Sequence, residues 1–310
     1  MLAPLTDARP EGIVFLGTPA TAARCLALIL KSGVDVDLVV TAEPKRRGRG
    51  ASLMKTPVHE LADAEGIPVV HDLDAMIFQI ESRGGVWLGV VIAYGRLIPQ
   101  QVLTRVPLVN LHFSLLPRWR GAAPVERAIL AGDDHVGVCV MRVVEALDAG
   151  EVYARVAIPV GPNDDVEELR DRLCVLGTAE LVRLLGSGWG TPEPQVGEPS
   201  YARKIAKEDR RLSFAESAEH LARTVRIGDA YGEFAGQRVK VSKVHVIDIA
   251  ESLERWPLGE VRLVGRRVVV ACGDGHLVLE RVQPAGKSVM SAGDWWNGVA
   301  STLGTARFDR

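Results

Sequence analysis

Residues 12–17 read Gly-Ile-Val-Phe-Leu-Gly and are followed by Thr-Pro, so a short apolar run ends in turn residues. Such a run predicts a strand that is buried on both faces of a sheet. Similar runs at residues 36–40, 67–70 and 87–93 are separated by segments of other character. This succession predicts an α/β fold in which helices cover both faces of a mostly parallel, Rossmann-like sheet.

Helical periodicity fills the intervals between these strands. The glycine pattern Gly-x-Gly-x-x-Gly is absent after the first strand, which argues against a nicotinamide-dependent dehydrogenase. Residues 137–144 and 152–160 are expected to add antiparallel strands to the sheet. The expected helices are residues 21–31, 58–65, 125–131 and 165–185.

The character of the sequence changes in its last third. Residues 186–199 are rich in Gly and Pro, and a helix is expected at residues 217–225. Short alternating strands then follow, two of them joined by the tight turn Gly273-Asp274-Gly275, as in a small OB-like β-barrel. We therefore expect a domain over residues 1–187, a linker over 188–208 and a barrel domain over 209–310.

The composition is that of an ordinary globular protein: 310 residues, 47% hydrophobic, 25% charged and a net charge of −2. No run approaches the roughly 18 apolar residues of a membrane span, and the N-terminus does not resemble a signal peptide. The four cysteines form no Cys-x-x-Cys pair, which favours reduced thiols and no metal site. We expect a cytoplasmic monomer. Residues 201–310 carry 18 Lys and Arg against 14 Asp and Glu, a mildly basic balance.

An amide, an imidazole and a carboxylate follow the fifth apolar run. Asn110 and His112 are two residues apart at the end of the strand expected from residue 106, so both should point to one face. Open α/β sheets bind ligands at this carboxyl end of their strands. Asp148 follows in the sequence Leu-Asp-Ala-Gly. Together these groups suit acyl transfer between nitrogens without a covalent intermediate.

The three groups have distinct candidate roles. The Asn110 amide can donate to the oxyanion of a tetrahedral intermediate. The His112 imidazole can exchange protons at neutral pH. Asp148 can orient the ring, raise its basicity or hold a catalytic water. In the alternative interpretation His112 is a core histidine, and Asn110 and Asp148 are turn residues. A hydrolase pair of Ser114 with His112 is disfavoured, because side chains two residues apart rarely point at each other.

Longer motifs carry a resemblance. Asn-x-His-x-Ser-Leu-Leu-Pro at residues 110–117, Arg-Gly-Ala-Ala-Pro at 120–124 and Leu-Asp-x-Gly at 147–150 resemble the folate-dependent formyltransferases. Residues 114–124 resemble in particular the branch of that family that formylates methionyl-tRNA. Further stretches that resemble the same branch lie at residues 15–19, 91–99, 201–205 and 283–290.

The resemblance implies 10-formyltetrahydrofolate as formyl donor and the α-amino group of methionyl-initiator tRNA as acceptor, in support of translation initiation. It makes residues 1–187 the catalytic domain and residues 209–310 a tRNA-binding domain. It also implies catalytic roles for Asn110, His112 and Asp148. The implied folate-facing residues are Tyr94, Gly95, Arg96, Leu97, Ile98, Ser114, Leu115, Leu116 and Pro117.

A basic loop follows the second strand and can reach phosphates. The sequence departs from the family there, because residues 43–46 read Glu-Pro-Lys-Arg where the family has a Pro-Asp-Arg-Pro core. Residues 226–234 are also shorter than in the family and lack its prolines. The candidate tRNA contacts in the loop are Lys45, Arg46, Arg47 and Arg49.

Two rival functions remain open. One is a formyltransferase that acts on an amino-sugar nucleotide or glycinamide ribonucleotide, against which the basic loop and the motifs at residues 201–205 and 283–290 argue. The other is a non-catalytic RNA-binding protein on the same fold. RNA binding alone does not require Asn110, His112 and Asp148, so these residues favour an enzyme.

Overall fold

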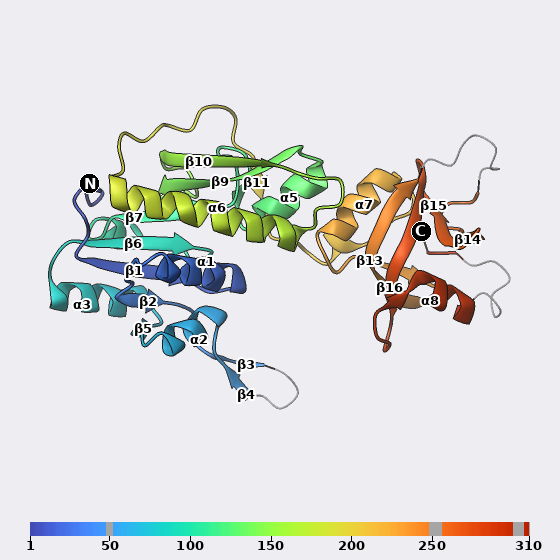
Figure 1. The fold of residues 1–310 in the computed structure, drawn as a ribbon, viewed down its shortest axis with the longest axis horizontal. Coiled ribbons are helices and arrows are strands. Elements are labelled where there is room, and N and C mark those ends of the chain that lie inside the picture. The colour runs from blue at the N-terminus through green and yellow to red at the C-terminus, as the bar shows by residue number, and fades with distance from the viewer. Residues whose placement is uncertain (48–51, 248–255, 300–306, 310) are drawn as a thin grey trace. The chain divides into compact units, whose positions relative to one another are not determined.

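The computed structural model describes residues 1–47, 52–247, 256–299 and 307–309, and for Arg47 the backbone only. The chain divides into two compact units. Figure 1 shows the fold, with the chain coloured by residue number. Unit 1 comprises Met1–Val125, His135–Pro159 and Glu167–Arg203, and unit 2 comprises Glu126–Asp134, Val160–Val166 and Lys204–Arg310.

Unit 1 is built on a seven-stranded sheet. Five neighbouring strands are parallel, and the two strands at one edge run antiparallel to their neighbours, as the sequence predicts. The α/β fold class is therefore confirmed. In sheet order the strands are β10 (Val152–Pro159), β9 (His135–Arg142), β7 (Leu108–His112), β6 (Trp87–Ile92), β1 (Gly12–Gly17), β2 (Leu38–Val40) and β5 (Val69–Val70).

Helices cover both faces of this sheet (Figure 1). On one face, Met76 of α3 lies in a buried cluster with Val14 of β1 and Leu108 of β7. On the other face, α6 approaches β7 so closely that a Cβ at Gly177 would lie 3.0 Å from the side chain of Leu111. The helices of unit 1 are α1 (Ala20–Lys31), α2 (Pro57–Ala64), α3 (Leu73–Arg83), α4 (Gln100–Leu103) and α6 (Val166–Ser187), and α5 (Pro124–Ala131) lies across the division.

Because side chains alternate along β7, Leu108, Asn110 and His112 share the face opposite α6. The neighbouring strands fix the position of this pair. Asn110 is in register with Val91 of β6 on one side and Met141 of β9 on the other. The candidate catalytic pair thus lies in the interior of the sheet, at the carboxyl end of its strand.

Unit 2 contains a curled antiparallel sheet of six strands (Figure 1), in agreement with the small barrel expected from the sequence. Its core includes Phe214, Phe234, Trp295 and Phe308, and Phe308 is fully buried. Its elements are η1 (Glu208–Arg210), α7 (Ala218–Arg226), β12 (Tyr231–Phe234), β13 (Gln237–Ile247), β14 (Val261–Val264), β15 (Arg267–Ala271), β16 (His276–Pro284), β17 (Met290–Ser291) and α8 (Ala292–Val299).

The segment between α7 and β12, which is expected from the sequence to be short, makes a tight turn. Gly228 and Asp229 both have positive φ values, 81° and 54°. Lys240 Nζ lies 2.7 Å from Asp229 Oδ1, so the turn is tied to β13. Both interactions with Lys240, hydrogen bonding and charge, hold the pKa of the Asp229 carboxyl below its usual range. The connection between α7 and β12 is therefore closed by local interactions.

Candidate active site

The His112 ring is fixed by a backbone carbonyl. Its Nε2 lies 2.9 Å from the carbonyl oxygen of Trp119, and the side chain is 6% exposed. A carbonyl oxygen can only accept a hydrogen bond, so Nε2 carries the proton. In the neutral ring the lone pair is therefore on Nδ1, and this nitrogen is the one available as a base.

Asp148 faces that nitrogen. Its Oδ2 lies 3.7 Å from His112 Nδ1 and accepts a 2.8 Å hydrogen bond from the backbone N–H of Gly121. Its Oδ1 lies 3.5 Å from Asn110 Nδ2. The structure thus brings together the three groups that the sequence singles out, although they come from β7 and a distant loop. Distances of this length are common without substrate and shorten when a reactant is bound.

The loop that carries Asp148 has a constrained backbone. Asp148 has a φ of 48°, which is uncommon for a residue other than glycine. Two residues later, Gly150 is buried against β9, where a Cβ would lie 1.9 Å from the carbonyl oxygen of Arg142. Only glycine fits this approach without displacement, so Gly150 determines how closely the Asp148 loop lies on the sheet.

We expect Gly150→Ala to lower the free energy of unfolding by about 1–3 kcal/mol, as overpacking does in well-packed interiors. The added methyl group must push the loop away from Arg142, so the Asp148 carboxylate should also shift relative to His112. Thermal unfolding measures the first effect. Gly186→Ala in α6 is the matched control, because a Cβ there meets nothing within 4 Å. Equal melting temperatures for the two variants would contradict the close approach.

The first predicted folate segment, residues 114–117, has two buried side chains. Ser114 donates a 2.6 Å hydrogen bond to the carbonyl oxygen of Arg118 and closes the turn after β7. Leu116 packs with Cys139, Met141 and Val152 beneath the turn. These two side chains support the turn from within.

Leu115 and Pro117 complete this segment and are partly exposed. The side chain of Leu115 lies over Gly137, where an added Cβ would be 2.2 Å away. The carbonyl oxygen of Pro117 accepts a hydrogen bond from the N–H of Ser200 at 3.3 Å. The folate roles predicted for the segment therefore remain predictions that involve its backbone and these two residues.

The second predicted folate segment, residues 94–98, follows β6. Tyr94 and Ile98 are buried in the core, and burial raises the pKa of the Tyr94 hydroxyl. Gly95 has a φ of 76°, and Arg96 donates to the carbonyl oxygen of His71 at 2.9 Å. Leu97 is 76% exposed, so it offers an apolar surface after the end of a central strand. The segment combines one exposed apolar side chain with turn backbone.

The predicted basic loop is a hairpin. Strand β3 (Lys45–Arg47) pairs antiparallel with β4 (Ser52–Met54), and the side chains of Lys45 and Arg46 are exposed. The backbone of Arg47 belongs to β3, whereas Arg49 lies outside the described residues. Lys45 and Arg46 are therefore held on a pair of short strands.

Three further residues hold the site. Trp119 and Gly121 lie within the motif at residues 114–124, which assigned them no role, and Gln195 lies in the stretch rich in Gly and Pro. Trp119 supplies the carbonyl that fixes His112, Gly121 supplies the N–H that binds Asp148, and Gln195 binds the Asp148 loop. Trp119 and Gly121 have φ values of 62° and 115°. The Arg-Gly pair at residues 120–121 is a turn signal, but nothing in the sequence indicates its contact with Asp148.

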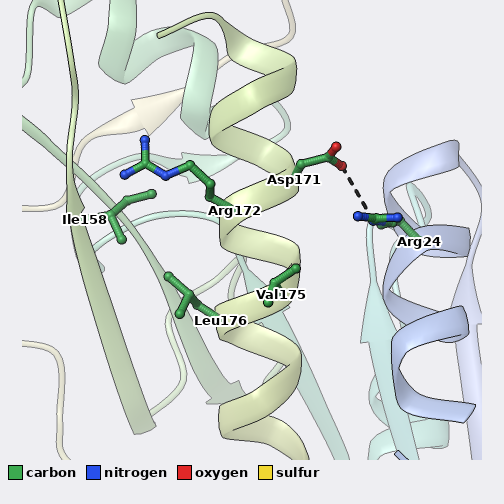
Figure 2. Close-up of a pocket in the computed structure, with 6 residues that line it drawn as sticks. All are labelled: Arg24, Ile158, Asp171, Arg172, Val175 and Leu176. Carbon is green, nitrogen blue, oxygen red and sulfur yellow. Dashed lines mark ion pairs between the residues drawn. The ribbon is translucent and has the colours of Figure 1, made fainter. Parts of the chain in front are cut away.

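A surface hollow of about 450 Å³ lies elsewhere in unit 1 (Figure 2). Arg24 of α1 and Asp171 of α6 form an ion pair with 3.7 Å between Arg24 Nε and Asp171 Oδ1. The helices α1 and α6 cover the face opposite Asn110 and His112, so the hollow takes no part in the candidate site. It is lined by Arg24, Ile158, Asp171, Arg172, Val175 and Leu176.

Metal ligands and membrane-spanning helices were both considered from composition, and the structure bears on each. No group of three or more His, Cys, Asp or Glu side chains is placed to hold a metal ion among the residues that the structure describes. In the same part of the chain, no helix is long and apolar enough to cross a membrane. The four cysteines, all described, are free thiols and buried.

An α/β sheet with an amide, an imidazole and a carboxylate at the end of a central strand suits an acyl-transfer enzyme. The chain belongs to the formyl transferase family: residues 12–185 match the model of the formyl transferase domain, and residues 204–300 match that of the formyl transferase C-terminal domain. It is 37% identical over 305 residues to the methionyl-tRNA formyltransferase of Thiobacillus denitrificans, covering 94% of this chain and 98% of that protein.

Solved structures share the fold. The methionyl-tRNA formyltransferase from Clostridium thermocellum superposes with a TM-score of 0.56 at 14% identity, over 76% of this chain and 93% of that one. WlaRD, a sugar 3N-formyl transferase determined in the presence of dTDP and 5-N-formyl-THF, superposes with a TM-score of 0.62 at 17% identity. That match covers 91% of this chain and 100% of WlaRD. At these identities the likeness concerns the fold.

Proposed function

We propose that this enzyme transfers the formyl group of 10-formyltetrahydrofolate to the α-amino group of methionyl-initiator tRNA. The observation that carries the proposal is the proximity of Asn110, His112 and Asp148 to one another. They lie in a chain of which 94% aligns with 98% of a methionyl-tRNA formyltransferase. The match extends through unit 2, which supports residues 209–310 as the tRNA-binding domain and residues 1–187 as the catalytic domain.

Asn110 and His112 have separate roles in the proposed reaction. Asn110 Nδ2 donates to the formyl oxygen and stabilises the negative charge that forms there when the amine attacks the formyl carbon. His112 Nδ1 takes the proton that the attacking amine loses. The protonated ring then returns a proton to the folate nitrogen as the bond between that nitrogen and the formyl carbon breaks. The products are formylmethionyl-tRNA and tetrahydrofolate, and no proton is gained or lost overall.

Asp148 supports both steps. In the protonated ring both nitrogens are donors, and the carboxylate lies 3.7 Å from the positive Nδ1. With side-chain exposures of 6% and 12%, the two residues are largely shielded from water, which strengthens their attraction. Asp148 therefore stabilises the imidazolium that forms during transfer, while the Trp119 carbonyl sets the orientation of the ring.

The residues after β6 fit a folate. Leu97 presents an exposed apolar side chain on a turn that begins at Gly95, with a φ of 76°. An exposed apolar side chain next to the polar groups of turn backbone suits a planar heterocycle with polar edges. When bound, 10-formyltetrahydrofolate supplies an activated formyl group. We assign its binding to Tyr94, Gly95, Arg96, Leu97 and Ile98, with the backbone of residues 114–117.

Acceptor choice tests the proposal. Purified protein is given labelled 10-formyltetrahydrofolate with methionyl-initiator tRNA, with an amino-sugar nucleotide or with glycinamide ribonucleotide. We expect formyl transfer to the methionyl-tRNA alone, with uncharged tRNA as a competitive inhibitor. Transfer to either small acceptor in preference to the tRNA would replace this proposal with the rival formyltransferase, and tRNA binding without any transfer would favour the RNA-binding protein.

The basic hairpin is the proposed site of tRNA phosphate contact. We expect Lys45→Ala with Arg46→Ala to weaken tRNA binding and to reduce the slope of log Kd against log salt by about 1 for each cation lost. The affinity for folate should stay unchanged, because the hairpin lies after β2, away from β6 and β7. Binding titrations across a range of salt concentrations measure the effect.

The control is Arg24→Ala with Arg105→Ala, which removes the same charge from two exposed ion pairs elsewhere in unit 1. An identical salt slope for the hairpin variant and the wild type would assign the tRNA contact to other residues. An equal loss in both double variants would show that only total charge matters.

A further inference from the structure

The segment of residues 193–202, here termed the crossing segment, runs beside both loops of the candidate site. Glu193 exchanges two backbone hydrogen bonds of 2.8 Å with Val152, next to the Asp148 loop. Ser200 accepts the Trp119 N–H on its side-chain oxygen at 2.9 Å. At its end, β11 (Tyr201–Ala202) pairs with β8 (Arg120–Gly121). A stretch that the composition marks as a linker is thus bonded to the catalytic loops of unit 1.

The Gln195 side chain bonds to both loops. Its Nε2 donates to the carbonyl oxygens of Asp148 and Gly150, each at 2.8 Å. Its Oε1 accepts two hydrogen bonds from the Arg120 guanidinium, at 3.1 Å from Nε and 2.6 Å from Nη2. A guanidinium only donates and a carbonyl only accepts, so the orientation of the amide is determined by its partners.

We infer that Gln195 is a positioning residue for formyl transfer, which holds the Asp148 carboxylate against His112 and Asn110. The hydrogen bonds form a closed ring that runs through Gln195, Arg120, Gly121 and Asp148. Gln195 links the Asp148 carbonyl to Arg120, and the next residue, Gly121, donates its N–H to the Asp148 carboxylate at 2.8 Å. The inference rests on the proposed function, since it concerns the same reaction.

The backbone at Asp148 explains why such a residue is needed. With φ at 48°, Asp148 adopts a conformation that a residue other than glycine rarely keeps without support. Its side-chain direction follows from this backbone conformation. If the carbonyls of Asp148 and Gly150 lost their shared donor, the loop could relax and turn the carboxylate from His112. The hydrogen bonds of Gln195 go to Arg120 and to the backbone carbonyls of Asp148 and Gly150, so its effect passes through Asp148.

The test uses Gln195→Glu, which keeps the shape and the acceptor for Arg120 but replaces the donor that faces the two carbonyls. We expect kcat to fall about 10- to 100-fold, because misplacement of a catalytic group by about 1 Å can cost about 100-fold. The KM for either substrate should change little. Glu193→Gln is the control on the same segment, since its side chain is 70% exposed and forms an ion pair with Arg155, away from Asp148 and Gly121.

Two measurements separate positioning from a general loss of structure. In an Asp148→Asn background, Gln195→Glu should add little further loss, since no carboxylate is left to place. Amide hydrogen exchange of Gly121 should be faster in Gln195→Glu than in the wild type, because its acceptor has moved.

Different results would overturn the positioning role of Gln195 and the proposed formyl transfer. A wild-type kcat in Gln195→Glu, a fully additive loss in the double variant or unchanged Gly121 exchange would each overturn the positioning role. A wild-type protein that transfers no formyl group would instead overturn the proposed function. The exchange measurement would then still decide whether Gln195 holds the Asp148 loop.

Discussion

Replacing His112 with glutamine is expected to lower kcat for formyl transfer by about 10²- to 10⁴-fold, the usual contribution of a positioned acid or base. A glutamine amide can still donate to the Trp119 carbonyl, so the local hydrogen bond is preserved. It cannot take up a proton at neutral pH, so the attacking amine keeps its proton until water removes it. Steady-state kinetics with both substrates at saturation measure the loss.

His112→Ala supplies the complementary experiment. The side chain is 6% exposed, and its removal leaves a cavity beside Asp148 that matches an imidazole molecule in size. Added imidazole should therefore restore part of the activity to His112→Ala and none to His112→Gln, where the cavity is filled. Full activity in either variant without imidazole would show that His112 is not the proton carrier.

Asn110→Leu is expected to lower kcat by about 10²- to 10³-fold, as the loss of one oxyanion donor does in acyl-transfer enzymes. Leucine has nearly the shape of asparagine, so the interior of the sheet between Val91 and Met141 can accommodate it. Because the donor acts on charge that develops in the transition state, the KM for folate should change far less than kcat.

The matched control is Gln101→Leu, the same type of change on the exposed surface of α4. It should leave both kinetic constants at their wild-type values. A loss in Asn110→Leu that appeared only in the KM would make Asn110 a binding residue, and the developing charge would need another donor.

The sheet of unit 1 could be predicted because its strands are short apolar runs closed by turn residues. Helix α3 was not predicted, although Leu73, Met76, Ile77 and Ile80 have helical spacing and Asp72 caps the helix by accepting from the Ala75 N–H. The two-residue strands β8 and β11 could not be predicted at all. They exist only because chain segments distant in sequence meet, and two residues carry no periodicity.

The candidate site shows the same limit. Alternation along a strand was enough to place Asn110 and His112 on one face. The proximity of Asp148 depends on positive φ angles at Asp148 and Trp119, which the residue types do not indicate. The support from Gln195 depends on the path of a Gly- and Pro-rich stretch that composition alone marks as a linker. The carbonyls and N–H groups that hold the site have no signature in the sequence.

In the proposed reaction Asn110 donates to the formyl oxygen, and His112 carries the proton from the attacking amine to the folate nitrogen. The decisive measurement is a crystal structure with a non-transferring 10-formyl folate analogue. We expect the formyl oxygen about 3 Å from Asn110 Nδ2, with room for the attacking amine beside His112 Nδ1. A formyl group bound beyond hydrogen-bond reach of both residues would contradict it.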